Sequence, residues 1–167
     1  CLKPGLLVSP GAGLVGELTL IDIGLELAGI GEPVVRRVCE SDATALLPLP
    51  GPNDDKYTRG VVGVVAGSPP YPGAGALCSG AARLGGAGMV RYAGSASDVV
   101  INRWPEIVVA ADGPATAGRV EAWVLGPGAG TDEAATAHLT QALESQVLVV
   151  IDADGLTLLS QDSSLRV

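Results

Sequence analysis

Residues 61–90 read VVGVVAGSPPYPGAGALCSGAARLGGAGMV, and this stretch decides the fold class. The continuous apolar run Val61–Ala66 is typical of a strand that is buried on both faces of a sheet. A loop rich in Gly, Pro and Tyr follows it and opens a small-residue helix that we predict at Gly73–Leu84. A glycine turn then leads into a second predicted strand at Met89–Ala93. This order of strand, helix and strand favours an α/β fold with a parallel sheet.

The same alternation continues toward the C-terminus. A helical turn is predicted at Ser97–Asn102, ended by Trp104-Pro105, because proline disfavours helix in the residue before it. Thr131 is in position to cap a helix at Asp132–Ser145. The other expected elements are strands at Ile107–Ala110, Ala122–Leu125 and Val147–Ile151, a helix at Leu156–Ser160, and the start of a strand at Ser164–Val167. The whole pattern predicts a layered α/β architecture with a mostly parallel sheet.

The residues before position 56 follow a different pattern. A short helix through Leu47 is expected, capped by Ser41-Asp42-Ala43. A run of Pro and Gly and then Asn53-Asp54-Asp55 has the composition of a linker, in which we interpret the aspartates as solvated. Strands are expected in this part at Leu6–Val8, Glu17–Ile23 and Val34–Val38.

Composition excludes several classes of protein. Hydrophobic residues make up 47% of the chain, so it can bury a core, and the net charge of −8 would repel a nucleic-acid backbone. A small anion can still be held locally by backbone amides. No apolar stretch approaches the roughly 20 residues that cross a membrane, and no signal-peptide pattern opens the chain. Cys1, Cys39 and Cys78 lack metal-site spacing and are interpreted as buried reduced thiols, which suits the cytoplasm.

One glycine motif resembles a dinucleotide-binding fingerprint. Gly11–Gly16 matches G-x-G-x-x-G, which has this meaning only where a helix follows, because the pyrophosphate rests on the N-terminus of that helix. The residues that follow, Glu17–Ile23, alternate like a strand. We therefore interpret the motif as a glycine turn.

Three loops at predicted strand ends are candidate binding elements. The Ala66–Gly75 loop joins a buried strand to a helix, where Ala74 and Gly75 would present N–H groups to a ligand. Gly126–Gly130 repeats this arrangement, and a plain turn explains it equally well. Asp152 and Asp154 could bind a hydroxyl, a ribose or a metal ion, or could cap a helix. Because the ends of parallel strands share one edge of the sheet, we expect these loops to converge. His138, in mid-helix, is interpreted as solvent-facing.

Seven short motifs together resemble the ADP-dependent NAD(P)H-hydrate dehydratase family, which has a ribokinase-like three-layer α/β/α fold. Two further stretches, Lys3-Pro4-Gly5-Leu6 and Gly16-Glu17-Leu18 with Asp22-Ile23-Gly24, resemble the end of an NAD(P)H-hydrate epimerase domain. The resemblance implies an epimerase tail at 1–38, a linker at 39–55 and the N-terminal part of a dehydratase at 56–167, incomplete at its C-terminus. The seven motifs are Lys56–Gly60, Ala66-Gly67-Ser68, Tyr71–Ala74, Gly86–Val90, Pro105-Glu106, Gly126–Gly130 and Asp152–Leu156.

The resemblance also implies a chemistry. ADP or ATP, with Mg²⁺, would phosphorylate the C6 hydroxyl of hydrated NADH or NADPH, and phosphate would then leave to restore the double bond. Ala74 and Gly128 fall where the family contacts the hydrated nucleotide. The family's lysine loop, its His-Pro-Gly-Glu segment and the Gly-x-Gly-Asp motif with the catalytic aspartate lie beyond Val167, so no catalytic or cofactor-binding residue is assigned. Together with the loop residues, the substrate-binding candidates are Ala74, Gly128, Gly73, Gly126, Asp152 and Asp154.

Because these motifs are absent, the 167-residue chain alone is expected to lack dehydratase and epimerase activity. A homo-oligomer is also expected, because a fragment with exposed sheet edges favours self-association. Asp55 stands where the family commonly has a histidine. The alternatives are a vitamin or sugar kinase of the same fold, or a non-catalytic nucleotide-binding module. A Rossmann oxidoreductase using Gly11–Gly16 is a further alternative.

Overall fold

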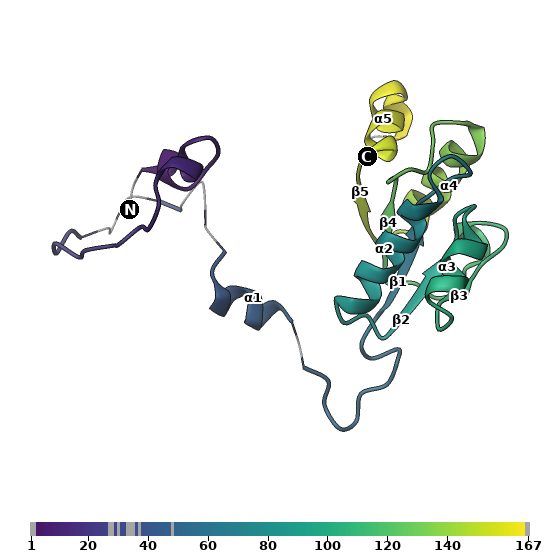
Figure 1. Cartoon of the computed structure of the whole chain (residues 1–167), viewed down its shortest axis with the longest axis horizontal. Coiled ribbons are helices and arrows are strands. Elements are labelled where there is room, and N and C mark those ends of the chain that lie inside the picture. The colour runs from purple at the N-terminus through teal and green to yellow at the C-terminus, as the bar shows by residue number, and fades with distance from the viewer. Residues whose placement is uncertain are drawn as a thin grey trace. The chain divides into compact units, whose positions relative to one another are not determined.

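The chain forms two units that are described separately. The computed structural model describes residues 3–26, 29, 31–32, 36, 38–47 and 49–165. The first unit is Cys1–Pro48 and the second is Leu49–Val167, which contains the sheet (Figure 1). In the described ranges, no helix combines the length and the apolar character needed to cross a bilayer.

The sheet of the second unit has five strands in the order β3-β2-β1-β4-β5, and every neighbouring pair is parallel. The predicted parallel α/β fold is therefore confirmed. The chain runs outward from β1 to β3 and then returns to the other side of β1 to form β4, so the strand order reverses between β1 and β4. The strands are β1 (Val61–Val65), β2 (Met89–Tyr92), β3 (Val108–Val109), β4 (Ala122–Leu125) and β5 (Leu148–Ile151).

Helices cover both faces of this sheet and complete three layers (Figure 1). On one face, α2 (Pro72–Leu84) and α3 (Ser97–Arg103) pack on a core that includes Val64 and Tyr92. On the other face, α4 (Glu133–Glu144) and α5 (Asp154–Gln161) pack on a core around Trp123. The helices that follow β1 and β2 therefore cover one face of the sheet, and those that follow β4 and β5 cover the other face.

Some helix ends differ in detail from the prediction. Asp132, and not Thr131, is the N-cap of α4, because its carboxylate accepts a hydrogen bond from the amide of Ala135 at 2.9 Å. Ala153 precedes α5, so Asp154 is the first residue of that helix and not its cap. The helix α3 ends at Arg103, one residue later than predicted, with Trp104 as its C-cap.

The first unit contains little regular structure among its described residues. The strands predicted at Leu6–Val8 and Glu17–Ile23 are wrong: Leu6 ends a 3₁₀ turn, and residues 18–23 have no regular structure. Leu20, Ile21 and Ile23 are about three-quarters exposed, so no partner strand or core holds an extended conformation here. Gly11–Leu14 is a 3₁₀ turn, which confirms the glycine-turn interpretation.

The predicted short helix of the first unit exists as α1 (Glu40–Leu46). Its N-cap is Cys39 and not Ser41, because the Cys39 amide donates to the Asp42 carboxylate at 2.9 Å. The strand predicted at Val34–Val38 lies outside the described residues except for positions 36 and 38.

The thiols and the C-terminal residues also depart from expectation. Cys39 is exposed and Cys78 is half-buried, so the interpretation as buried thiols is wrong for Cys39, while Cys1 lies outside the described residues. Ser163–Leu165 forms a 3₁₀ turn and not the start of a strand, and the last two residues are not described.

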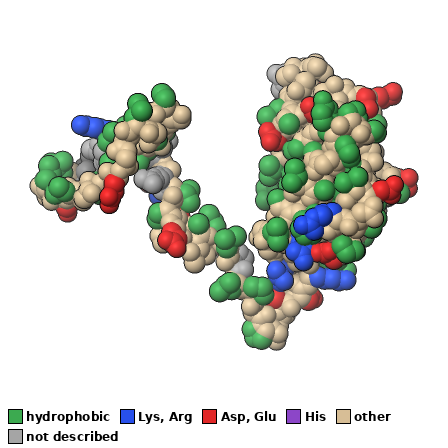
Figure 2. Space-filling model, in the orientation of Figure 1, with side chains coloured by type: hydrophobic (Ala, Val, Ile, Leu, Met, Phe, Trp, Pro, Cys, Tyr) green, Lys and Arg blue, Asp and Glu red, His purple; other side chains and the backbone are tan. Residues whose placement is uncertain are grey.

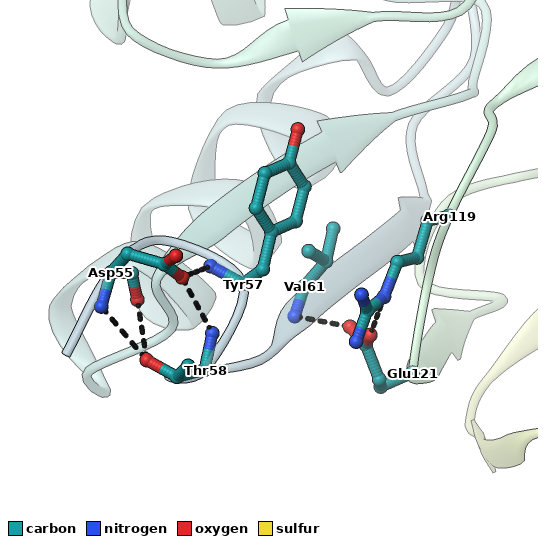
Figure 3. A network of polar contacts seen from close by, with 6 residues as sticks. All are labelled: Asp55, Tyr57, Thr58, Val61, Arg119 and Glu121. Carbon is teal, nitrogen blue, oxygen red and sulfur yellow. Dashed lines mark hydrogen bonds and ion pairs between the residues drawn. The ribbon is translucent and has the colours of Figure 1, made fainter.

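A polar network fastens the start of β1 to the start of β4 (Figure 3). The Val61 amide donates to the Glu121 carboxylate, which also pairs with Arg119. Before β1, the Asp55 carboxylate accepts hydrogen bonds from the amides of Tyr57 and Thr58, at 2.7 and 2.8 Å. Asp55 is exposed, as predicted, but it organises a turn and is not a passive linker residue.

Candidate functional site

The reversal point of the sheet brings two of the predicted loops into direct contact. The Gly67 amide, two residues after β1, donates a 2.8 Å hydrogen bond to the carbonyl of Pro127, two residues after β4. A Cβ on Gly67 would lie 2.8 Å from the Gly75 nitrogen, and the residue has φ +77, so only glycine suits this position. In open α/β sheets, ligands bind outside the carboxyl ends of strands at such a point.

Gly128 extends this contact to the start of α2. A Cβ on Gly128 would lie 2.9 Å from the Ala74 Cβ and 3.1 Å from the Tyr71 Cβ, and its φ is +61. The two residues that the family resemblance singles out, Ala74 and Gly128, are therefore neighbours in space although far apart in sequence. Pro72, the first residue of α2, has no N–H, and the Ala74 amide donates to the Tyr71 carbonyl at 3.2 Å. The positive end of the α2 dipole still lies at this edge and favours an anion.

The β5–α5 loop completes the cluster. The Asp154 carboxylate accepts a 2.9 Å hydrogen bond from the Gly130 amide, which ties this loop to the β4–α4 loop. Gly126 packs against the Asp152 carbonyl and would place a Cβ 2.8 Å from the Gly155 nitrogen. The predicted convergence of the loops at one edge thus occurs, and we call this edge, where the five strands end, the carboxyl edge.

The candidate residues differ in how openly they face solvent. A Cβ on Gly73 or Gly130 would meet nothing within 4 Å, so a ligand could approach their backbone. Tyr71, beside Gly128, is 66% exposed. Asp152 is exposed and its carboxylate accepts from the Ala153 amide at 2.8 Å, whereas Asp154 is half-buried. Gly126 is buried, and loop packing accounts for its lack of a side chain.

Sequence reasoning missed Tyr92, the last residue of β2. Its side chain is fully buried, and its hydroxyl donates to the Ala66 carbonyl at 2.6 Å and accepts from the Ala96 amide at 2.9 Å. Burial raises the pKa of this phenol, so the O–H remains a donor across the physiological range. A tyrosine that closes a strand just before Gly94 is the only signal that the sequence offers.

Charge is divided unevenly over the second unit. Figure 2 shows Lys and Arg side chains gathered at the lower end of this unit, where the strands begin. The loops at the carboxyl edge carry acidic residues and, within residues 49–165, no Lys or Arg. The basic residues of that range are Lys56, Arg59, Arg83, Arg91, Arg103 and Arg119.

Two other titratable groups of the second unit, His138 and Cys78, are half-buried. His138 is half-buried, with its ring in the space that a Cβ on Gly113 would need, so the solvent-facing interpretation is wrong. Burial lowers the pKa of His138, against the opposing charge of Asp132. Burial and then the charge of Asp152 raise the pKa of the Cys78 thiol, which disfavours its nucleophilic thiolate.

The family model of NAD(P)H-hydrate dehydratase matches residues 62–167, which include the whole sheet from Val62 onward and all three loops. The chain belongs to the NAD(P)H-hydrate dehydratase family. The family membership that the seven motifs indicated is thereby confirmed.

Relatives of the dehydratase family extend the comparison. The bifunctional NAD(P)H-hydrate repair enzyme Nnr of Mycobacterium tuberculosis is 53% identical over 150 residues, which cover 90% of this chain and 31% of that protein. The ADP-dependent (S)-NAD(P)H-hydrate dehydratase of Neisseria meningitidis is 40% identical over 118 residues, covering 66% of this chain and 40% of the relative. The chain therefore spans less than half the length of either relative.

Solved structures agree on the fold. The ADP/ATP-dependent NAD(P)H-hydrate dehydratase of Bacillus subtilis, co-crystallised with ATP and Mg²⁺, aligns with a TM-score of 0.62 at 25% identity, over 71% of this chain and 46% of that chain. A ribokinase-like superfamily protein from Enterococcus faecalis aligns with a TM-score of 0.61 at 24% identity, over 69% of this chain and 44% of that chain. The predicted ribokinase-like α/β fold is confirmed.

Proposed function

We propose that this chain supplies the substrate-binding half of an enzyme that repairs hydrated NADH or NADPH by ADP- or ATP-dependent dehydration. The observation that carries this proposal is the hydrogen bond from Gly67 to Pro127 across the reversal point, within a region that belongs to the dehydratase family. It sets two glycine-rich loops side by side where an α/β sheet binds ligands. A hydroxyl is a poor leaving group and a phosphate a good one, which explains how a kinase-like fold can serve a dehydration.

The proposed role of each loop follows from its geometry. Ala74 and Gly128, which pack against each other, would contact the hydrated nicotinamide nucleotide, and the open faces of Gly73 and Gly130 would admit it. Asp154 keeps the Gly130 amide in place, while the exposed Asp152 is free to accept a hydrogen bond from a sugar hydroxyl. Gly126 would contribute by letting the two loops pack. In this proposal the residues of the chain bind and orient substrate, and contribute through positioning.

Backbone amides and carboxylates at the carboxyl edge are the groups that could hold a nucleotide and Mg²⁺. A backbone cradle with helix N-termini suits a phosphate. No group of three or more His, Cys, Asp or Glu side chains in the described ranges is arranged to hold a metal ion. Mg²⁺ commonly binds through substrate phosphates and one or two carboxylates, so we propose that it accompanies the nucleotide. ADP or ATP supplies a phosphoryl group when bound.

We further propose the domain arrangement that the resemblance implies. Residues 1–38 would be the tail of an epimerase domain, 39–55 a linker and 56–167 the N-terminal part of a dehydratase domain that continues in a longer polypeptide. The Mycobacterium tuberculosis relative, named a bifunctional repair enzyme, matches across 90% of this chain and supports this assignment. A homo-oligomer and a cytoplasmic location belong to the same proposal.

Titration of the isotope-labelled chain tests the proposed site. Hydrated NADH should shift the amide resonances of Ala74 and Gly128. The amide resonance of Thr58, which lies at the opposite edge where the strands begin, should not change. Shifts confined to residues away from the carboxyl edge would contradict the site. A vitamin or sugar that displaces the hydrate would favour a small-molecule kinase.

Turnover is tested separately. Hydrated NADH and ADP are incubated with this chain and with a longer polypeptide that contains it, and recovery of NADH absorbance is followed. We expect NADH absorbance to recover with the longer polypeptide and not with the 167-residue chain. Recovery with the 167-residue chain would refute the expectation that catalytic groups lie elsewhere.

A further inference from the structure

Tyr92 lies beneath the proposed site without reaching its surface. The side chain is fully buried at the end of β2, in register with Val64 of β1 and Val109 of β3. Its hydroxyl links the first residue after β1 to the loop after β2, through Ala66 and Ala96. One phenolic oxygen therefore joins two loops of the carboxyl edge.

Two glycines make room for this hydroxyl. A Cβ on Gly75 would lie 2.9 Å from the Tyr92 oxygen, and a Cβ on Gly94 would lie 2.6 Å from it. The same two positions crowd the Ala66 carbonyl, at 3.1 and 2.7 Å. The first turn of α2 thus approaches the Tyr92–Ala66 hydrogen bond from one side and the β2–α3 loop approaches it from another. Any larger residue at either position would displace the hydroxyl.

Contacts lead from Tyr92 to the proposed substrate contacts. Ala66 is bonded to Gly67, whose amide donates to the Pro127 carbonyl at 2.8 Å. Pro127 is followed by Gly128, which packs against Ala74. Movement of the Ala66 carbonyl would therefore change the separation of the two loops that face the ligand.

We propose that the Tyr92 hydroxyl is a positioning group that sets the separation of the β1–α2 and β4–α4 loops, and thereby the fit of the hydrated nucleotide between Ala74 and Gly128. This inference rests on the proposed function for its ligand, and on the hydrogen bonds of Tyr92 for its mechanism. Tyr92 is fully buried, so it would not contact the ligand directly. Its effect passes through Ala66 and Gly67 to Pro127.

The test compares Tyr92→Phe with two control variants in the full chain. Tyr57→Phe makes the same chemical change at the opposite edge of the sheet (Figure 3). Ile107→Val trims another buried side chain of the same core, 5% exposed, and lowers stability while keeping the Tyr92 hydroxyl. Amide hydrogen exchange is measured at Gly67, with Leu139 of α4 as a reference for global opening.

We expect Tyr92→Phe to speed exchange at Gly67 about tenfold relative to Leu139, the factor that one buried hydrogen bond is worth in an equilibrium constant. The same variant should weaken binding of hydrated NADH by about the same factor. Both controls should leave the ratio of Gly67 to Leu139 exchange and the affinity unchanged. An unchanged ratio in Tyr92→Phe, or a raised ratio with unchanged affinity, would overturn the proposal.

Failure of ligand binding and failure of the variant to fold have different consequences. If the wild-type chain binds no hydrated NADH, the proposed function fails, and the exchange ratio still decides whether Tyr92 locks the loops. If Tyr92→Phe does not fold, Gly94→Ala replaces it, because the added methyl group would press on the hydroxyl. That variant should raise the exchange ratio at Gly67 and weaken binding in the same way, and wild-type values for both would overturn the proposal.

Discussion

Gly63 in β1 is the register partner of Trp123 in β4, and the indole ring occupies the space that a side chain on Gly63 would need. A Cβ at this glycine would lie 2.8 Å from the Trp123 Cδ2 and closer still to two other ring atoms. Trp123 is 2% exposed and stands at the centre of the core beneath α4. The indole ring of Trp123 in β4 therefore packs directly on the backbone of Gly63 in β1, which helps to hold the two strands together.

Gly63→Ala should destabilise the fold through this contact. Overpacking of a core costs about 1–3 kcal/mol, because neighbouring side chains must leave their preferred positions. Urea unfolding followed by the fluorescence of the tryptophans measures the loss. Combining the change with Trp123→Leu should cost less than the sum of the two single changes, because the smaller side chain leaves room for the methyl group. Strict additivity would show that the ring is not the obstacle.

Gly128→Ala and Gly130→Ala separate backbone strain from loop packing. Both glycines have positive φ, +61 and +83, so backbone strain should lower the unfolding free energy of each alanine variant by about 1–2 kcal/mol. Only Gly128 would in addition press a methyl group against Ala74. Thermal unfolding should therefore show a larger loss for Gly128→Ala. Equal losses would mean that the β4–α4 loop moves freely away from α2.

Asp154→Asn tests the carboxylate that holds the β4–α4 loop. The asparagine keeps an oxygen acceptor for the Gly130 amide and loses the charge that strengthens this bond and suits the first turn of α5. We expect a loss of about 1 kcal/mol in denaturant unfolding. Asp112→Asn, at an exposed position in the unit, is the matched control and should change stability little. A similar loss in both variants would count against a specific role for Asp154.

Glu121 should make stability depend on acid pH. The Val61 amide and then Arg119 hold the pKa of this carboxyl below its ordinary value of 4.5. A lowered folded pKa adds stability that is present above 4.5 and is lost as the pH falls through the folded value. Glu121→Gln should therefore lower the melting temperature at pH 7 and have progressively less effect as the pH falls below 4.5. A difference that persists unchanged at pH 2 would contradict this assignment.

The fold was predictable where one local pattern dominates. β4 has the predicted bounds, Ala122–Leu125, and β1 lacks only the last predicted residue, because buried parallel strands appear as unbroken apolar runs. The strand predicted at Glu17–Ile23 shows the limit of the same reasoning. Its alternation suits a sheet, but a strand also needs a partner, and the described residues of the first unit supply none.

The candidate site was predictable as a set of loops but not as a set of contacts. Parallel strands bring their ends to one edge, so Gly126–Gly130 and Asp154 could be expected near the Ala66–Gly75 loop. The Gly67–Pro127 hydrogen bond and the role of Tyr92 depend on strand order, which places β4 beside β1. A tyrosine within a strand gives no sign of which carbonyl its hydroxyl will reach.

The uneven placement of charge has a consequence for how an anion would reach the carboxyl edge. At a distance, a phosphate meets the acidic loops and no basic side chain of residues 49–165, so the field of this unit opposes its approach. At contact it meets backbone N–H groups, whose attraction is short-ranged. Added salt screens the first effect far more than the second, so capture by this edge should strengthen with ionic strength, the reverse of the response of a lysine-lined site.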